Sequence, residues 1–310
     1  MADSPPTDAA RHDAAPSGRV EARYLAFLET IAHIRPSLHR YCARMTGSVL
    51  DGEDVAQETL FQAYRKLDTY DDARPLAPWL FRIAHNRCID FLRRRELRQQ
   101  AESAAAEPDY APPVEPADPG LGKAVEHLVL RLPPKERACI LLKDVFDYSL
   151  EEIADLVDST VGGVKAALSR GRTKLAQRPV ASTSGRAHSN EDAALLRLYV
   201  DRFNQRDWVG LRELIAADAR LLVADRYVGP LSAAPYFTTY ERMTVPWRFA
   251  AGEIDGEPVV IILHETASGW APDAAARLRV SDGRIVDIAD YFHCPWIVDA
   301  ASTLLVDPLV

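Results

Sequence analysis

The sequence predicts a multidomain protein in which two all-α domains precede one α+β domain. Helical periodicity of apolar residues runs through two long blocks, whereas strand-like apolar runs appear only in the last third of the chain. Stretches rich in Pro, Ala, Ser and charged residues separate these blocks. A chain of 310 residues has room for two or three domains. The expected boundaries are a disordered tail at 1–20, a helical domain at 21–99, a linker at 100–120, a helical domain at 121–178, a linker at 179–189 and an α+β domain at 190–310.

The bulk composition narrows the class of protein. The net charge of -8 argues against a histone-like coat on DNA, although a local basic face can still bind phosphates. The four cysteines are widely spaced without a CxxC pair, so we expect no disulfide framework, no metal site and no cofactor. No apolar run approaches the roughly 20 residues that span a bilayer, and the N-terminus lacks the apolar core of a signal peptide. We therefore expect a soluble, cytoplasmic protein without membrane contact.

The first helical block contains a helix with an aromatic side chain on its polar face. Apolar residues recur at helical spacing and predict a core stripe of Ala56, Leu60, Tyr64 and Leu67. The opposite face contains Asp54, Gln57, Glu58, Phe61 and Arg65. An aromatic ring among acidic and polar groups is unusual for a solvated surface. This face is therefore either a docking surface for a partner helix or a solvated surface with one isolated Phe.

Residues 79–98 predict a second helix of this block with a basic stripe. Its apolar stripe comprises Leu80, Ile83, Ala84, Cys88 and Phe91. Another side carries Arg82, His85, Asn86 and Arg93, and Arg94 and Arg95 complete an arginine triplet. Basic groups neutralise phosphates, and aromatic residues such as Trp79 stack on unpaired bases. Cations are also favoured at a helix C-terminus, which accounts for the triplet but not for the whole stripe.

The second helical block has the pattern of a helix-turn-helix. Ser149 and Glu152 predict a capping box at the start of a short helix, and residues 159–163 form a tight connection to a second helix. Between Thr160 and Arg178 there are five Lys or Arg residues and no Asp or Glu. A charge of one sign suits a helix that enters the major groove of DNA. Two short helices joined by a turn also occur in purely structural roles.

Four motifs in these blocks occur in the order that is typical of one family. The motifs are DVAQETL at 54–60, PWLFRIAHN with IDFLRRR at 78–95, LPPKER at 132–137 and VKAALSRGR at 164–172. In this order, residues 24–178 resemble regions two and four of the bacterial extracytoplasmic-function (group IV) sigma factors of RNA polymerase. Gly162-Gly163 departs from the family, in which a single Gly is often followed by Thr, and this puts the promoter preference in question but not the class.

The resemblance implies partners and contact residues. The partners are core RNA polymerase, through its β′ clamp helices and β flap, and promoter DNA. The residues implied to bind polymerase are Asp54, Gln57, Glu58 and Phe61. Those implied to read the minus-ten element are Trp79, Arg82, His85, Asn86, Arg93 and Arg94. Those implied to read the minus-thirty-five element are Thr160, Lys165, Ser169, Arg170 and Arg172.

The last third of the chain resembles the SnoaL-like domains, which have a cone-shaped α+β fold around a pocket. The resemblance rests on YVDRFNQRDW at 199–208, LREL at 211–214, DARL at 218–221 and the late strand GRIVDI at 283–288. Enzymes of this fold use a buried Asp and His as acid and base, and the residues available for such a pocket are Asp225, Trp247, His264, Asp290 and His293. The alternative is that these are strand-end polar residues or contacts between domains.

Three functions remain open from the sequence. The first is a transcription initiation factor without enzymatic activity, in which the C-terminal domain modulates the output; an anti-sigma factor or a small ligand would be a further partner. Such a factor would associate with the nucleoid through RNA polymerase. The second is a SnoaL-like enzyme fused to a DNA-targeting module. The third is a helix-turn-helix repressor that binds duplex DNA alone.

Overall fold

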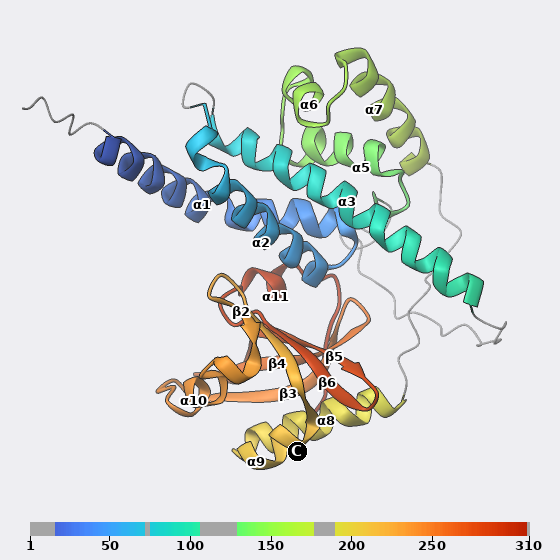
Figure 1. Ribbon diagram of the computed structural model, residues 1–310. Helices are drawn as coiled ribbons and strands as arrows, with labels where there is room; N and C mark the ends of the chain where they lie inside the picture. The colour runs from blue at the N-terminus through green and yellow to red at the C-terminus, as the bar shows by residue number, and fades with distance from the viewer. Residues whose placement is uncertain (1–15, 72–74, 106–128, 177–189, 309–310) are drawn as a thin grey trace, which may run out of the picture.

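A computed structural model describes residues 16–71, 75–105, 129–176 and 190–308 (Figure 1). The two helical blocks lie together, and the α+β domain lies against one side of the first block. The linker expected at 179–189, and most of the tail at 1–20 and of the linker at 100–120, lie outside the described residues. Within those residues, no helix is long and apolar enough to cross a membrane.

The first helical block consists of three helices and a short 3-10 turn. They are α1 (Pro16–Thr46), α2 (Val49–Arg65), η1 (Leu67–Thr69) and α3 (Leu76–Ala105). Gly47 ends α1 with a φ of 89°, a left-handed conformation that glycine adopts without a steric penalty. Ser48 then caps α2, because its hydroxyl accepts a hydrogen bond from the Asp51 backbone N–H at 3.2 Å. The chain thus reverses between two helices in two residues.

Close contact between α1 and α2 depends on Gly52. A Cβ atom at this position would lie 2.4 Å from the Cα and backbone N of Ala43. The predicted core stripe of α2 is confirmed at Ala56, Leu60 and Leu67, which are buried. The prediction is wrong for Tyr64, which is 55% exposed and packs edge-on against the Tyr24 ring at the end of the stripe.

The second helical block contains the predicted helix-turn-helix. Its elements are α5 (Pro134–Ile140), a π-helical turn η2 (Leu141–Val145), α6 (Leu150–Leu156) and α7 (Val161–Ala176). The capping box at the start of α6 is present, with both Ser149–Glu152 hydrogen bonds formed. Thr160 begins α7 in the same way, because its hydroxyl accepts a hydrogen bond from the Gly163 backbone N–H at 3.0 Å.

The two helical blocks share one hydrophobic core. The Phe81 ring of α3 lies 5.4 Å from the ring of Phe146 and 5.7 Å from that of Tyr148, both from the second block. Arg137 crosses the junction and donates to the backbone carbonyl of Met45. His85 is also inside this region, only 7% exposed and 2.9 Å from the Tyr41 hydroxyl through Nδ1. Burial lowers the pKa of His85 to about 4, so the imidazole is neutral at pH 7.

The C-terminal domain is a seven-stranded sheet with five helical segments. Its helices are α8 (Asn190–Asn204), α9 (Trp208–Leu214), η3 (Leu231–Ala233), α10 (Tyr236–Glu241) and α11 (Trp296–Ala300). Its strands are β1 (Ile215–Val223), β2 (Tyr227–Pro230), β3 (Trp247–Ile254), β4 (Glu257–Thr266), β5 (Gly269–Ser281), β6 (Arg284–Asp290) and β7 (Leu304–Val306). The strand order is β2-β1-β6-β5-β4-β3-β7, and only β1 and β6 are parallel neighbours within this sheet.

Both faces of this sheet are buried. Successive residues of a strand point to opposite faces, so the continuous apolar run of β4 supplies two cores. Val260 and Ile262 pack in the core formed with α8, α9 and α10. Val259, Ile261 and Leu263 pack in a second core that includes α11 and residues of the first helical block. The C-terminal domain therefore completes one of its cores with α1 and α2 (Figure 1).

Gly52→Ala should destabilise the first helical block by about 1–3 kcal/mol, because the added methyl group has to push α1 and α2 apart. Urea unfolding followed by circular dichroism measures this change. The control is Gly162→Ala, whose Cβ would meet only the Thr160 hydroxyl at 3.9 Å and should not destabilise the chain. Equal stability of Gly52→Ala and the native chain would contradict the close approach.

The buried His85 predicts an acid-sensitive core. Its folded-state pKa of about 4 lies below the ordinary histidine pKa of 6.5, so the unfolded chain takes up a proton first and stability falls as the pH drops from 6.5 towards 4. Relative to a His85→Gln variant, the native chain should lose about 2 kcal/mol of unfolding free energy between pH 7 and pH 5. Urea titrations at both pH values test this. Parallel losses in the two proteins would show that His85 is not the titrating group.

Candidate polymerase and promoter surfaces

Three of the four residues expected to bind polymerase form an open surface on α2. Phe61 is 63% exposed, and the Arg65 guanidinium lies 5.8 Å from its ring centroid. The Glu58 carboxylate is exposed and accepts from Arg87 of α3 at 3.1 Å. Gln57 is half-buried and donates to Glu53 at 3.2 Å. The expectation of an exposed aromatic ring on an acidic face is confirmed by the exposure of Phe61.

The fourth residue, Asp54, contacts the C-terminal domain. Its Oδ1 accepts a hydrogen bond from the Tyr291 hydroxyl at 2.8 Å, and its Oδ2 lies 3.2 Å from Nη1 of Arg277. Removal from water raises the pKa of Asp54 to about 6, against the opposing effects of Arg277 and Tyr291. The carboxylate still keeps 37% of its side-chain exposure. No local pattern in the sequence points to these partners, which lie more than 220 positions away.

A shallow groove of roughly 530 Å³ follows the side of this surface between α2 and α3. Its lining mixes carboxylates, guanidiniums and apolar side chains: Asp54, Val55, Glu58, Phe91, Arg94, Leu97 and Arg98. Arg94 lies 3.9 Å from Glu58 across it. The polymerase-binding and minus-ten residues of the resemblance thus meet at one groove.

Most of the residues expected to read the minus-ten element are accessible on α3. Asn86, Arg93 and Arg94 are exposed. Trp79 is half-buried and packs on Tyr70 with ring centroids 4.8 Å apart. Arg82 is turned towards the second helical block, where Nη1 lies 3.7 Å from Asp155.

His85 is the exception to the basic stripe of α3. Its imidazole is buried against Tyr41 and cannot reach DNA in this conformation. The helical spacing correctly places position 85 on the same side as Arg82. It gives no information on the second helical block, which covers that side.

The residues expected to read the minus-thirty-five element fall into two groups on α7. Lys165 and Ser169 are exposed near the start of the helix, where Thr160 acts as its cap. Arg170 and Arg172 lie further along and are held by carboxylates of the same domain. Arg170 donates to Glu136 at 2.9 Å, and Arg172 donates to Asp144 at 2.6 and 3.3 Å.

These acidic partners position the recognition helix. Glu136 belongs to the LPPKER motif and also accepts from Lys174 at 2.8 Å, which lowers the pKa of its carboxyl group together with Arg170. Gly171 permits close contact with α5, since a Cβ there would lie 2.6 Å from Cδ1 of Ile140. The motif thus fixes α7 on α5 and leaves the N-terminal part of α7 open.

The five residues proposed for a C-terminal pocket have different immediate partners. Asp225 pairs with Arg35 of α1 at 3.2 Å, at the contact between domains. His264 pairs through Nδ1 with Asp273 at 2.9 Å, a partner that the sequence interpretation missed. His293 is exposed, although its charge acts on the nearby Asp290. Asp225 thus lies at the contact between domains, and His264 of β4 is paired with Asp273 of the neighbouring strand β5.

Asp290 is fully enclosed by an aromatic interior. Its carboxylate accepts hydrogen bonds from the hydroxyls of Tyr236 at 2.8 Å and Tyr240 at 2.7 Å. Burial raises the pKa of Asp290. Phe203 fills the centre of the domain and stacks on Phe249 at 4.2 Å. Trp247 joins this packing and donates from Nε1 to the carbonyl of Tyr240.

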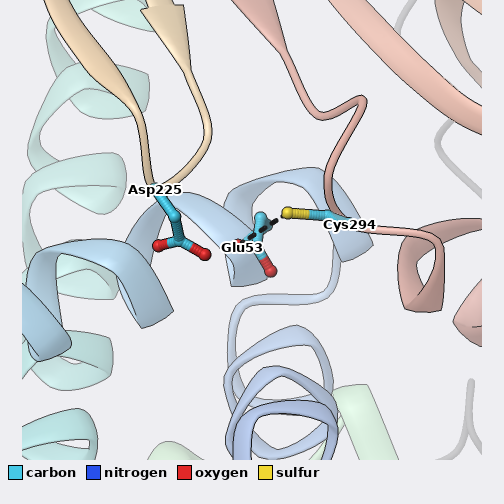
Figure 2. Close-up of side chains that lie close together, drawn as sticks. All are labelled: Glu53, Asp225 and Cys294. Carbon is cyan, nitrogen blue, oxygen red and sulfur yellow. Dashed lines mark hydrogen bonds between the residues drawn. The ribbon is translucent and has the colours of Figure 1, made fainter. Parts of the chain in front are cut away.

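The sequence interpretation also missed a buried polar cluster between α2 and the C-terminal domain. Glu53 is fully buried and accepts from Trp296 at 2.9 Å and from the Cys294 thiol at 3.5 Å. Glu53, Asp225 and Cys294 lie close enough together to resemble a metal-ligand set (Figure 2). Arg35 already pairs with both carboxylates, and burial near Glu53 raises the pKa of the Cys294 thiol. The cluster is therefore a salt-bridged contact, with Arg35 as its cation.

Comparison with known protein families supports the folds assigned to the two helical blocks. Residues 30–98 match the Sigma-70 region 2 family, and residues 122–175 match the Sigma-70, region 4 family. Among solved structures, one match is the extracytoplasmic function sigma factor SigJ of Mycobacterium tuberculosis. The match covers 85% of this chain and 95% of the SigJ chain, with 16% identity and a TM-score of 0.34.

Curated relatives place the chain in one family. It is 32% identical over 162 residues to the ECF RNA polymerase sigma factor SigW of Bacillus subtilis (strain 168). The matched segment covers 48% of this chain and 87% of SigW. It is also 32% identical over 219 residues to the ECF RNA polymerase sigma factor SigG of Mycobacterium tuberculosis. This matched segment covers 61% of this chain and 59% of SigG. The order of the helical blocks, their motifs and these relatives agree: the chain belongs to the extracytoplasmic-function RNA polymerase sigma factors.

Proposed function

We propose that this sigma factor binds core RNA polymerase through the open surface of α2 and directs it to promoters through α3 and α7. Residues 21–99 would act as region two, residues 121–178 as region four, and residues 190–310 as a domain that modulates their activity. The observation that carries this proposal is the exposed Phe61 beside Gln57 and Glu58, in a motif that precedes the basic helices in the family order. Binding to polymerase would bring the chain to the nucleoid.

The two promoter surfaces have different chemistry. On α3, Arg93 and Arg94 can neutralise phosphates, while Asn86 and Trp79 offer an amide and a ring to unpaired bases. On α7, Lys165 and Ser169 are the exposed residues at the end that a recognition helix presents to base edges. Arg170 and Arg172 are paired to carboxylates, so their contribution to DNA affinity would require these pairs to be shared or broken.

The C-terminal domain supports regulation more than catalysis. Sigma factors initiate transcription and are not enzymes, and the interior where an acid and a base would have to meet is packed with aromatic rings. The contacts of this domain with α2 give it a physical route to the polymerase-binding surface. An anti-sigma factor or a small ligand acting on that contact would be the further partner.

Run-off transcription with core polymerase tests the proposed function. The full chain should start transcription from a subset of genomic fragments, and Lys165→Ala should reduce the output from each of them several-fold. A gel shift on duplex promoter DNA, with and without core polymerase, is the complementary measurement. Tight, sequence-specific binding without core and no run-off product would instead establish a helix-turn-helix repressor.

Phe61→Ala should weaken binding to core polymerase by about tenfold or more, because an exposed aromatic ring at the centre of a docking surface is the type of residue that dominates binding energy. The free energy of unfolding should change by less than about 0.5 kcal/mol, since the ring is exposed. Fluorescence anisotropy with labelled core measures the affinity. Leu305→Ala, an exposed apolar residue of β7, is the matched control. An unfolded Phe61→Ala variant would place this ring in the core.

A further inference from the structure

The C-terminal domain holds α2 through two adjacent charged clusters. In the first, Arg277 of β5 lies 3.0 Å from Asp51, 3.2 Å from Asp54 and 2.7 Å from Glu257. Tyr291 adds its hydroxyl hydrogen bond to Asp54 at 2.8 Å. One arginine of the C-terminal domain thus pairs with two carboxylates of α2.

The second cluster lies around Glu53, which stands between Asp51 and Asp54 in the sequence of α2. Cys294 reaches Glu53 from the C-terminal domain (Figure 2). Trp296 of the same domain also donates to Glu53, and Arg35 reaches it from α1. Arg35 and Gln57 would remain as partners of Glu53 if the C-terminal domain moved away, because both belong to the first helical block. Region two would therefore still supply a cation and a hydrogen-bond donor to Glu53 if the C-terminal domain separated from α2.

The apolar part of the contact is small on the side of region two. Among the described residues, Ala43, Val49 and Leu50 are the region-two members of the buried core that they share with β3, β4, β5 and α11. The charges are also unbalanced. Five carboxylates at this contact face two guanidiniums: the carboxylates are Asp51, Glu53, Asp54, Asp225 and Glu257, and the guanidiniums are Arg35 and Arg277. A modest apolar area and surplus negative charge make this contact easier to open than a domain core.

Asp54 shares its side of α2 with the open docking surface. Positions 54, 57, 58 and 61 follow the spacing of one helix face, so a partner that covers the last three reaches the first. A partner that uses Asp54 has to offer a cation or a hydrogen-bond donor to its carboxylate. Arg277 and Tyr291 already occupy both oxygens.

We propose that the C-terminal domain competes with core polymerase for α2, with Arg277 and Tyr291 in the place of the polymerase groups that would contact Asp54. This inference rests on the proposed function and specifies its regulation. In this proposal, the Asp54 carboxylate binds either Arg277 and Tyr291 of the C-terminal domain or groups of polymerase, but not both at once. Opening exposes the α2 carboxylates to polymerase and leaves Glu53 paired with Arg35.

Affinity measurements with the full chain and core polymerase test the competition. Arg277→Ala and Tyr291→Phe should each tighten binding to core, by about tenfold for Arg277→Ala and less for Tyr291→Phe, because each weakens the closed state and leaves Asp54 intact. The matched control is Arg279→Ala, two positions along the same strand, which pairs with Asp287 inside the C-terminal domain and should bind core like the native chain. Unchanged or weaker binding by both Arg277→Ala and Tyr291→Phe would overturn the competition.

Hydrogen exchange of the native chain gives a readout that needs no variant. With saturating core polymerase, α2 should become protected, while residues 270–300 of the C-terminal domain should exchange faster than in the free chain. Continued protection of 270–300 in the complex would also overturn the competition. If neither the native chain nor Arg279→Ala bound core at all, the proposed function itself would fail, and the competition with it.

Discussion

The fold of this sigma factor depends on the fact that helix α2 is packed on two sides at once. Val55 and Ala56 enter the core shared with region four, and Val49 and Leu50 enter the core shared with the C-terminal sheet. Glu53 lies at the second contact and is fully buried, so its charge requires a buried cation. Arg35 supplies it. A buried ion pair adds little net stability over apolar packing, but removing one partner leaves an uncompensated charge, which costs several kcal/mol. The pair therefore keeps the buried charge of Glu53 compensated at this contact.

The parts of the fold that follow from local rules could be predicted from the sequence. The capping box at Ser149, the buried stripe at Ala56 and Leu60, and the strand-like run that became β4 all depend on neighbours within one or two turns or on strand alternation. Tyr64 shows the limit of periodicity. It has the spacing of the stripe, but its ring packs edge-on against the partly exposed Tyr24 and remains 55% exposed.

Several candidate residues have surroundings that the sequence did not predict, and the cause is the same for each: a distant segment of the chain covers them. His85 is on the expected side of α3, but the second helical block covers that side. Asp54 is on the expected face of α2, but Arg277 and Tyr291 reach it from more than 220 positions away. The pocket residues Asp225 and His264 were chosen by their position at strand ends, and each found a partner that no spacing rule relates to it. Helical and strand periodicities specify the face of an element but not its neighbour.

In the last third of the chain, both faces of the sheet are covered as well. A curved sheet with an open interior could hold a ligand, but here Phe203, Trp247 and Phe249 fill the space on one face. The other face is completed by α1 and α2 rather than by its own helices alone. The interior of the domain is filled, and its second core is shared with region two. Its polar contacts with the rest of the chain lie at this shared core. There, Tyr291 and Arg277 meet the acidic helix α2, which we propose to bind polymerase. Under this proposal, the domain acts on transcription through α2.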